Sequence, residues 1–148
     1  MNPPFDMRLV PLVLLMLGCG PPFARIEETT FAAALDVDLS RSSRLPQGVY
    51  VRDVDPALPR NGTDELDFTC FLADGTEVRR GRVTSRKLWY GQLAWNETIA
   101  GFQIGTFGTR EWSARQLIVP PELAYGDLGA SGVPPNAILI FLVEIARP

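Results

Sequence analysis

The chain has 148 residues, of which 46% are hydrophobic and 21% are charged, a composition typical of one folded globular domain. The sequence contains no histidine, which excludes hydrolases with a histidine base and zinc sites with histidine ligands. Its formal net charge of -3 offers no positive field that would attract nucleic acid. We therefore expect no nucleic-acid partner.

The first residues are typical of an export signal. An apolar run extends from Leu9 to Leu17, which is shorter than the roughly 20 residues that a membrane-spanning helix needs. The run ends at Met16-Leu17-Gly18-Cys19, which resembles the lipidation box of bacterial lipoproteins. That resemblance implies a signal peptide at 1–18, a lipid on Cys19, attachment to a membrane, and a place in the bacterial cell envelope with the domain in the periplasm or outside the cell. An ordinary secretory leader and an uncleaved membrane anchor are the alternatives.

The segment that follows shows no sustained apolar period up to Leu45. We predict that residues 19–45 form a lipidated N-terminus and a flexible tether, with a reach of about 30 Å, ahead of a domain at 46–148. In an exported chain Cys70 is then the one thiol left in the domain, so we expect it to be buried as a small apolar side chain.

Alternating apolar residues predict strands at 49–51 and 66–72. Asp74-Gly75 follows the second of these and predicts a type I′ hairpin turn, in which both central residues have positive φ, with a returning strand at 77–80.

The segment 96–104 is expected to be the main helix, with Asn96 as its N-cap and Gly105 at its end. Two further strands are predicted at 112–119 and 138–145. The second is so apolar that it should lie at the centre of the sheet. This order of elements predicts an α+β domain in which an antiparallel sheet packs against one helix.

Several motifs of the domain occur together in one order. They are Phe68-Thr69, Leu72-Ala73-Asp74-Gly75-Thr76, Ile99-Ala100-Gly101-Phe102, Leu123-Ala124-Tyr125-Gly126, Gly132-Val133-Pro134-Pro135-Asn136-Ala137 and Leu139-Ile140-Phe141-Leu142-Val143-Glu144. This series resembles the FKBP-type peptidyl-prolyl cis-trans isomerases. The resemblance implies an antiparallel sheet of approximately five strands wrapped around one short helix. It also implies isomerisation of X-Pro bonds in unfolded or folding polypeptides, here exported ones, without a metal or cofactor.

The resemblance also assigns a pocket to individual residues of this chain. The catalytic positions are Tyr125, Phe141, Phe102 and Ile99, and the substrate-binding positions are Phe68, Val78, Glu97, Thr98 and Val133. Tyr125 would donate a hydrogen bond from its hydroxyl to a substrate carbonyl. Without the resemblance, the apolar members of this set would be interpreted as ordinary core residues.

Val78-Arg79 is the main departure from the family, which usually has a Phe-Asp pair there. An unpaired guanidinium is costly to bury, so we predict that Arg79 points to solvent. The departure favours an alternative hypothesis, a binding module or chaperone of the same fold with weak or no isomerase activity. In either case we expect a monomer, because the short tether leaves no room for a dimerisation segment.

Overall fold

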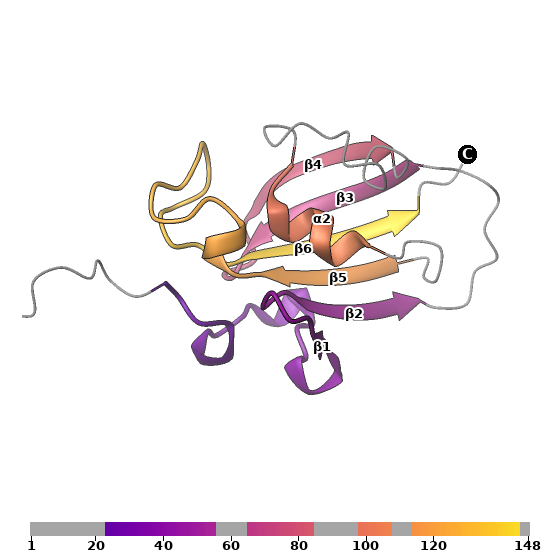
Figure 1. Ribbon diagram of the computed structural model, residues 1–148, viewed down its shortest axis with the longest axis horizontal. Helices are drawn as coiled ribbons and strands as arrows, with labels where there is room; N and C mark the ends of the chain where they lie inside the picture. The colour runs from indigo at the N-terminus through magenta and orange to yellow at the C-terminus, as the bar shows by residue number, and fades with distance from the viewer. Residues whose placement is uncertain (1–22, 56–64, 85–97, 108–113, 146–148) are drawn as a thin grey trace, which may run out of the picture.

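The computed structural model describes residues 23–55, 65–84, 98–107 and 114–145 (Figure 1). Its largest feature is an antiparallel sheet of six strands in the order β1-β2-β5-β6-β3-β4. The strands are β1 (Ser43–Arg44), β2 (Tyr50–Asp55), β3 (Glu65–Leu72), β4 (Glu77–Thr84), β5 (Ala114–Val119) and β6 (Leu139–Ile145). One short helix, α2 (Ala100–Thr106), packs on one face of this sheet (Figure 1). The predicted α+β class is confirmed, and the two-residue β1 accounts for a sixth strand beyond the approximately five expected.

Strand β6 lies between β5 and β3, as its apolar sequence predicted. Because side chains alternate along a strand, its residues divide between two hydrophobic clusters. Leu139, Phe141 and Val143 belong to the cluster on the helix face, whereas Ile140, and Ile138 just before the strand, belong to a cluster on the opposite face. Both faces of the sheet are therefore covered around β6.

The turn between β3 and β4 differs from the predicted type I′ turn. Gly75 has φ +90°, but Asp74 is not among the described residues with positive φ. Instead, the Leu72 carbonyl accepts a hydrogen bond from the Gly75 amide at 3.0 Å, and the Asp74 carboxylate accepts one from the Thr76 amide at 2.9 Å. The loop that joins β3 and β4 is therefore longer than a two-residue turn and has one glycine with positive φ. The Asp74 side chain stabilises this loop locally.

Helix α2 begins and ends later than predicted. Ile99, its N-cap residue, has extended backbone (φ −76°, ψ 154°), so the helix begins at Ala100, and the predicted cap Asn96 lies outside the described residues. Gly105 is inside the helix and does not end it. A Cβ on Gly105 would approach Leu117 Cδ2 to 2.8 Å, and one on Gly101 would approach Val119 Cγ1 to 2.1 Å. The two glycines therefore allow close packing of α2 on β5.

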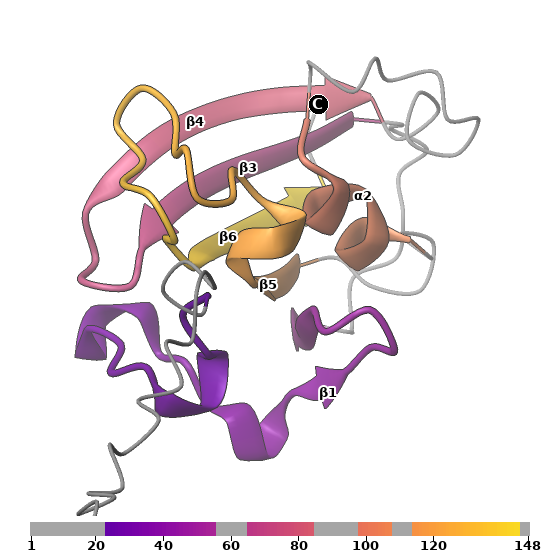
Figure 2. The same ribbon diagram turned by 60° about the vertical axis from the view of Figure 1, so that its left-hand side comes forward.

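Residues 23–45 are a part of the fold, which corrects the prediction that they form a flexible tether. We call this segment the N-terminal strap. It contains the 3-10 turns η1 (Ile26–Glu28), η2 (Ala33–Leu35) and η3 (Leu39–Arg41) and ends in β1. The strap lies along the face of the sheet opposite to α2 (Figure 2). The prediction failed because the apolar residues of the strap are spaced irregularly. This spacing fits 3-10 turns rather than one helix or strand.

Polar groups and one buried side chain fix the strap to the sheet. Ile26 is 3% exposed and packs with Ile118 and Ile140. The side-chain Nε2 of Gln116 donates to the Leu35 backbone carbonyl at 2.7 Å, and the Arg52 guanidinium donates to the backbone carbonyl and the carboxylate of Asp36. Within the described residues, no helix has the length and apolarity needed to cross a membrane.

Candidate functional site

Three phenylalanine rings from three different elements meet on the helix face of the sheet. Phe68 comes from β3, Phe102 from α2 and Phe141 from β6. The ring centroid of Phe102 lies 5.3 Å from that of Phe68 and 5.1 Å from that of Phe141. The centroids of Phe68 and Phe141 are 6.2 Å apart. The two pairs that Phe102 makes are edge-to-face, an arrangement that aromatic pairs prefer, and the Phe68–Phe141 pair is tilted. We call these three rings the aromatic triad.

The triad is buried to different degrees. Phe102 is 1% exposed and Phe141 6% exposed, whereas Phe68 is only partly buried. Gly81 of β4 makes the position of Phe68 possible, because a Cβ on Gly81 would lie 2.9 Å from Phe68 Cζ. Sequence reasoning missed Gly81. Its only signal is a glycine inside a predicted strand, which often marks a close approach.

Three aliphatic side chains from separate segments pack against the same cluster as the triad: Val78, Ile99 and Val133. Val78 sits where the pairing of β4 with β3 shifts its register, between the pairs Cys70 with Arg79 and Phe71 with Glu77. Such a bulge lets two successive residues point differently from a regular strand. Here Val78 packs on the cluster and Arg79 is exposed, as predicted for that guanidinium.

Tyr125 lies at the start of the loop between η5 (Pro121–Leu123) and β6, and this loop appears in orange in Figure 2. The residue is 40% exposed and outside the apolar cluster. Among the described residues, its hydroxyl has no hydrogen-bond partner, while its carbonyl accepts from the Gly129 amide at 3.2 Å. The hydroxyl is thus free to donate to a ligand.

Internal hydrogen bonds give this loop a defined shape. The Asn136 amide donates to the Gly126 carbonyl at 2.8 Å, and Ala130 and Val133 exchange two bonds of 2.9 Å. Gly129 has φ +68°, and a Cβ there would lie 2.4 Å from the Val133 carbonyl oxygen. The loop therefore holds Val133 against the core cluster on one side and leaves Tyr125 accessible on the other.

Of the predicted site residues, six are brought together in one cluster: Phe68, Val78, Ile99, Phe102, Val133 and Phe141. Thr98 is half-buried just before α2. Glu97 and Cys19 lie outside the described residues. The functional roles of all these positions stay predictions.

The cluster is chemically apolar. Cys70 is 4% exposed, as expected, and burial raises the pKa of its thiol from 9.0 to about 12, so it stays neutral and a poor nucleophile at physiological pH. Within the described segments, no group of three or more metal-ligating side chains is found. What the arrangement offers a ligand is an apolar, aromatic cluster whose Phe68 ring is only partly buried, and an exposed tyrosine on the loop after η5.

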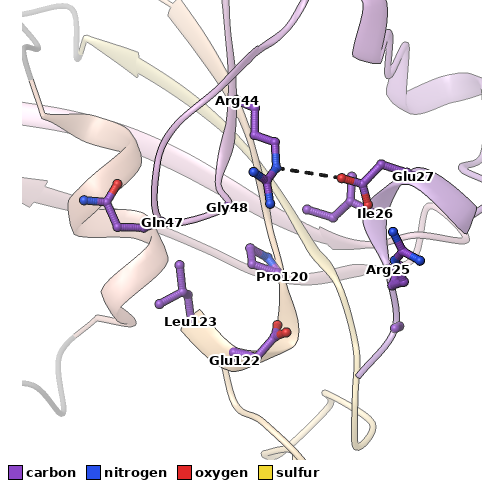
Figure 3. A pocket seen from close by; sticks show the side chains of 10 residues that line it. Arg25, Ile26, Glu27, Arg44, Gln47, Gly48, Pro120, Glu122 and Leu123 are labelled. Atoms are coloured by element: carbon purple, nitrogen blue, oxygen red, sulfur yellow. Dashed lines mark ion pairs between the residues drawn. The ribbon is translucent and has the colours of Figure 1, made fainter. Parts of the chain in front are cut away.

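A hollow lies at the junction of the strap and the sheet (Figure 3). Its volume is about 380 Å³, and its lining comes from the strap, the β1–β2 turn and η5. The lining residues are Ala24, Arg25, Ile26, Glu27, Arg44, Gln47, Gly48, Pro120, Glu122 and Leu123. Sequence reasoning missed this cavity because it treated one of its walls as a tether. We call it the strap cavity.

Comparison with known proteins identifies the framework that holds the triad. A model of the FKBP-type peptidyl-prolyl cis-trans isomerase family matches residues 59–146, more than half of the chain. The chain belongs to this family. The match begins after β2, so it covers the triad and the Tyr125 loop but not the strap.

Individual relatives and structures agree with the family. An FK506-binding protein of Neisseria meningitidis is 37% identical over 87 residues, which are 55% of this chain and 75% of that protein. Human FKBP10 is 42% identical over 81 residues, but the match spans 53% of this chain and only 13% of the length of FKBP10. A peptidyl-prolyl cis-trans isomerase from Pseudomonas syringae has the same fold, with a TM-score of 0.54 at 19% identity over 78% of this chain and 85% of that one.

Proposed function

We propose that this FKBP family member catalyses cis-trans isomerisation of X-Pro bonds in exported polypeptides. The observation that carries the proposal is the aromatic triad in an FKBP framework, together with an exposed Tyr125 whose hydroxyl has no partner among the described residues. A proline ring is apolar and would pack on Phe68, Phe102 and Phe141. The Tyr125 hydroxyl would donate to a carbonyl of the substrate backbone.

The proposed mechanism needs no nucleophile. Amide resonance opposes rotation with a barrier of about 18–20 kcal/mol, and the planar amide is more dipolar than the twisted one. An apolar pocket that excludes water therefore disfavours the planar ground state relative to the twisted transition state. In this chain the triad supplies the apolar surface, while Ile99, Val78 and Val133 line its edges. Backbone carbonyls of Glu97 and Thr98 would hold the substrate chain.

The proposed location is the bacterial cell envelope, with a lipid on Cys19 and residues 1–18 removed as a signal peptide. The support is the Met16-Leu17-Gly18-Cys19 box and the apolar run before it. Relatives in Neisseria meningitidis and Escherichia coli are compatible with a bacterial source. Replacing Cys19 with serine should move the protein from the membrane to the soluble fraction, and membrane attachment that persists through salt extraction would refute lipidation at this residue.

A second candidate is a monomeric binding module of the same fold, and Val78-Arg79 favours it. Val78 offers a smaller wall than the phenylalanine usual in the family, and the exposed Arg79 carries a charge opposite to the usual aspartate. We predict weak isomerase activity that the double variant Val78→Phe with Arg79→Asp raises about ten-fold in kcat/KM on an X-Pro peptide, equivalent to about 1.4 kcal/mol.

The matched control is Arg80→Asp, which makes the same charge change at the next position of β4. Arg80 is exposed and pairs with Glu77 at 3.0 Å, so this variant should leave kcat/KM near that of the parent. A folded double variant without gain over an active parent would show that these two positions do not limit catalysis. If parent and double variant are both inactive, the binding module is the better hypothesis.

A further inference from the structure

Strand β4 lies at the edge of the sheet, and its arginines differ in how their charge is compensated. Arg80 pairs with Glu77 at 3.0 Å, and Arg82 pairs with two carboxylates of β3 at 2.6 and 3.2 Å. Arg79 is exposed and forms no ion pair with a carboxylate in the described part of the chain. Its positive charge is therefore available to a ligand.

The pairing of β4 with β3 places Arg79 on the face of the sheet that carries the aromatic triad. A Cβ on Gly81 would lie 2.9 Å from Phe68 Cζ, and Val83 packs on the same cluster. Every second residue of a strand points to one face, so the Arg79 side chain leaves β4 on this face too. Directly opposite Arg79 is Cys70, which belongs to the helix-face cluster, and cross-strand partners share a face. Arg79 thus lies two positions along β4 from the residue that faces Phe68.

The charge of Arg79 acts on the apolar cluster without being buried in it. Burial raises the pKa of the Cys70 thiol to about 12, and the positive charge of Arg79 opposes this rise. Because the Arg79 side chain is exposed, its guanidinium keeps contact with water and can exchange partners.

Arg79 also follows the point where β4 meets the Tyr125 loop. Its neighbour Val78 packs on the cluster, and a Cβ on Gly132 would lie 3.8 Å from Val78 Cγ1. Figure 2 shows this orange loop beside β4. In a client chain, the Cα atom next to a proline is about 3.8 Å away across a trans bond and about 2.9 Å across a cis bond. A residue adjacent to a proline on Phe68 is therefore within reach of the Arg79 guanidinium.

We propose that Arg79 is a specificity-determining residue that selects clients with a glutamate or aspartate directly before or after the proline. This inference rests on the proposed binding of proline at the triad. The guanidinium presents a planar fork of donors that matches a carboxylate. The pairing does not involve the rotating bond, so it stabilises the bound ground state and the transition state equally. It should lower KM and leave kcat unchanged.

Matched peptides test this selection on the full chain with Cys19→Ser. In each pair a glutamate beside the proline is replaced by glutamine, once before and once after it, and both peptide ends are blocked so that no terminal charge contributes. NMR titration gives the dissociation constant, and exchange NMR gives kcat and KM. At one or both positions, the glutamate peptide should bind about three-fold more tightly with the same kcat, as expected for an exposed ion pair. The preference should disappear at about 1 M salt, where the Debye length falls to about 3 Å.

Three variants assign the preference to this side chain. Arg79→Gln should bind the glutamate and glutamine peptides equally, and Arg79→Lys, which keeps the charge, should retain part of the preference. Arg80→Gln is the matched control, because Arg80 lies opposite Thr69, on the other face of the sheet, and should leave the preference intact. Equal affinities in the parent, or a preference that survives Arg79→Gln, would overturn the proposal.

Separate readouts of binding and turnover distinguish this inference from the proposed function. Accelerated exchange with equal affinity for both peptides would refute selection by Arg79 and support the isomerase. A preference in binding that depends on Arg79, without accelerated exchange, would support the selection and refute the isomerase. If the protein binds none of the peptides, both proposals are refuted.

Discussion

Phe102 is both a core side chain and the floor of the proposed pocket. Its ring is 1% exposed and touches both other rings of the triad. Sequence reasoning placed this residue on the apolar face of a helix, and the family resemblance placed it in the pocket. The structure confirms the core position, and the role in the pocket stays a prediction.

Truncation of Phe102 should destabilise the whole domain. Phe102→Ala removes a fully buried ring, which costs about 3–5 kcal/mol when the cavity stays open. We expect a correspondingly lower denaturation midpoint with an unchanged m-value. Leu128→Ala is the control, because Leu128 is 86% exposed and its truncation should leave the midpoint in place. A midpoint of Phe102→Ala equal to that of the parent would put this ring outside the core.

The thiol of Cys70 should be unreactive in the folded protein. Burial raises its pKa from 9.0 to about 12, and the thiolate is the reactive species. Alkylation at pH 8 should label Cys70 only after denaturation, in a chain whose Cys19 is replaced by serine. The raised pKa also means that burial of Cys70 favours the fold below pH 9.0 and that this contribution is lost as the pH rises toward 12. Rapid alkylation under native conditions would contradict the buried position.

At the level of elements, regular strands were predictable and irregular segments were not. The alternation in β3 and the apolar run of β6 specify burial directly, so both strands were placed correctly. The start of α2 was not, since Ile99 stays extended and no side chain caps the helix at that residue. The strap was missed because it is stabilised by distant partners, among them Tyr50 and Gln116, which no local pattern reveals.

The strap should contribute to the stability of the domain. Ile26→Ala removes an isoleucine that is 3% exposed, and such truncations typically cost about 2–5 kcal/mol. Unfolding by urea should show a lower midpoint with a single transition, because Ile26 shares a cluster with Ile118 of β5 and Ile140 of β6. The neighbouring change Thr30→Ala, at an exposed position, should have little effect. An unchanged midpoint for Ile26→Ala would mean that the strap is not part of the folding unit.

The packing of the strap against the sheet should also weaken in acid. The hydrogen bond from Tyr50 lowers the pKa of Glu27 below its usual value of 4.5. The folded state therefore binds fewer protons at Glu27, so its contribution is present above pH 4.5 and is lost as the pH falls through the lowered pKa. The effect is small, because the Glu27 side chain is 43% exposed. In acid titrations, Tyr50→Phe should reduce the loss of stability at low pH, and an identical loss in parent and variant would contradict this role of Glu27.

At the scale of the whole molecule, the fold class and the clustering of most candidate site residues were predictable from the sequence. Six of the predicted site residues converge because they lie on adjacent strands, on α2 and on one loop. The position of Tyr125, which is 40% exposed, depends on the shape of the loop that follows η5 and could not be derived from periodicity. The arrangement of the strap and the triad on opposite faces likewise appears only in three dimensions.

The most direct test of the central claim is the isomerisation rate of a short X-Pro peptide measured by exchange NMR, with the Cys19→Ser chain as catalyst. Uncatalysed isomerisation takes tens to hundreds of seconds. The parent should accelerate it measurably, and Tyr125→Phe should lower kcat/KM about ten-fold, as expected for one lost hydrogen bond worth about 1.4 kcal/mol, without a change in stability. A folded parent that leaves the exchange rate at its uncatalysed value would contradict the claim that the aromatic triad and Tyr125 form an isomerase site.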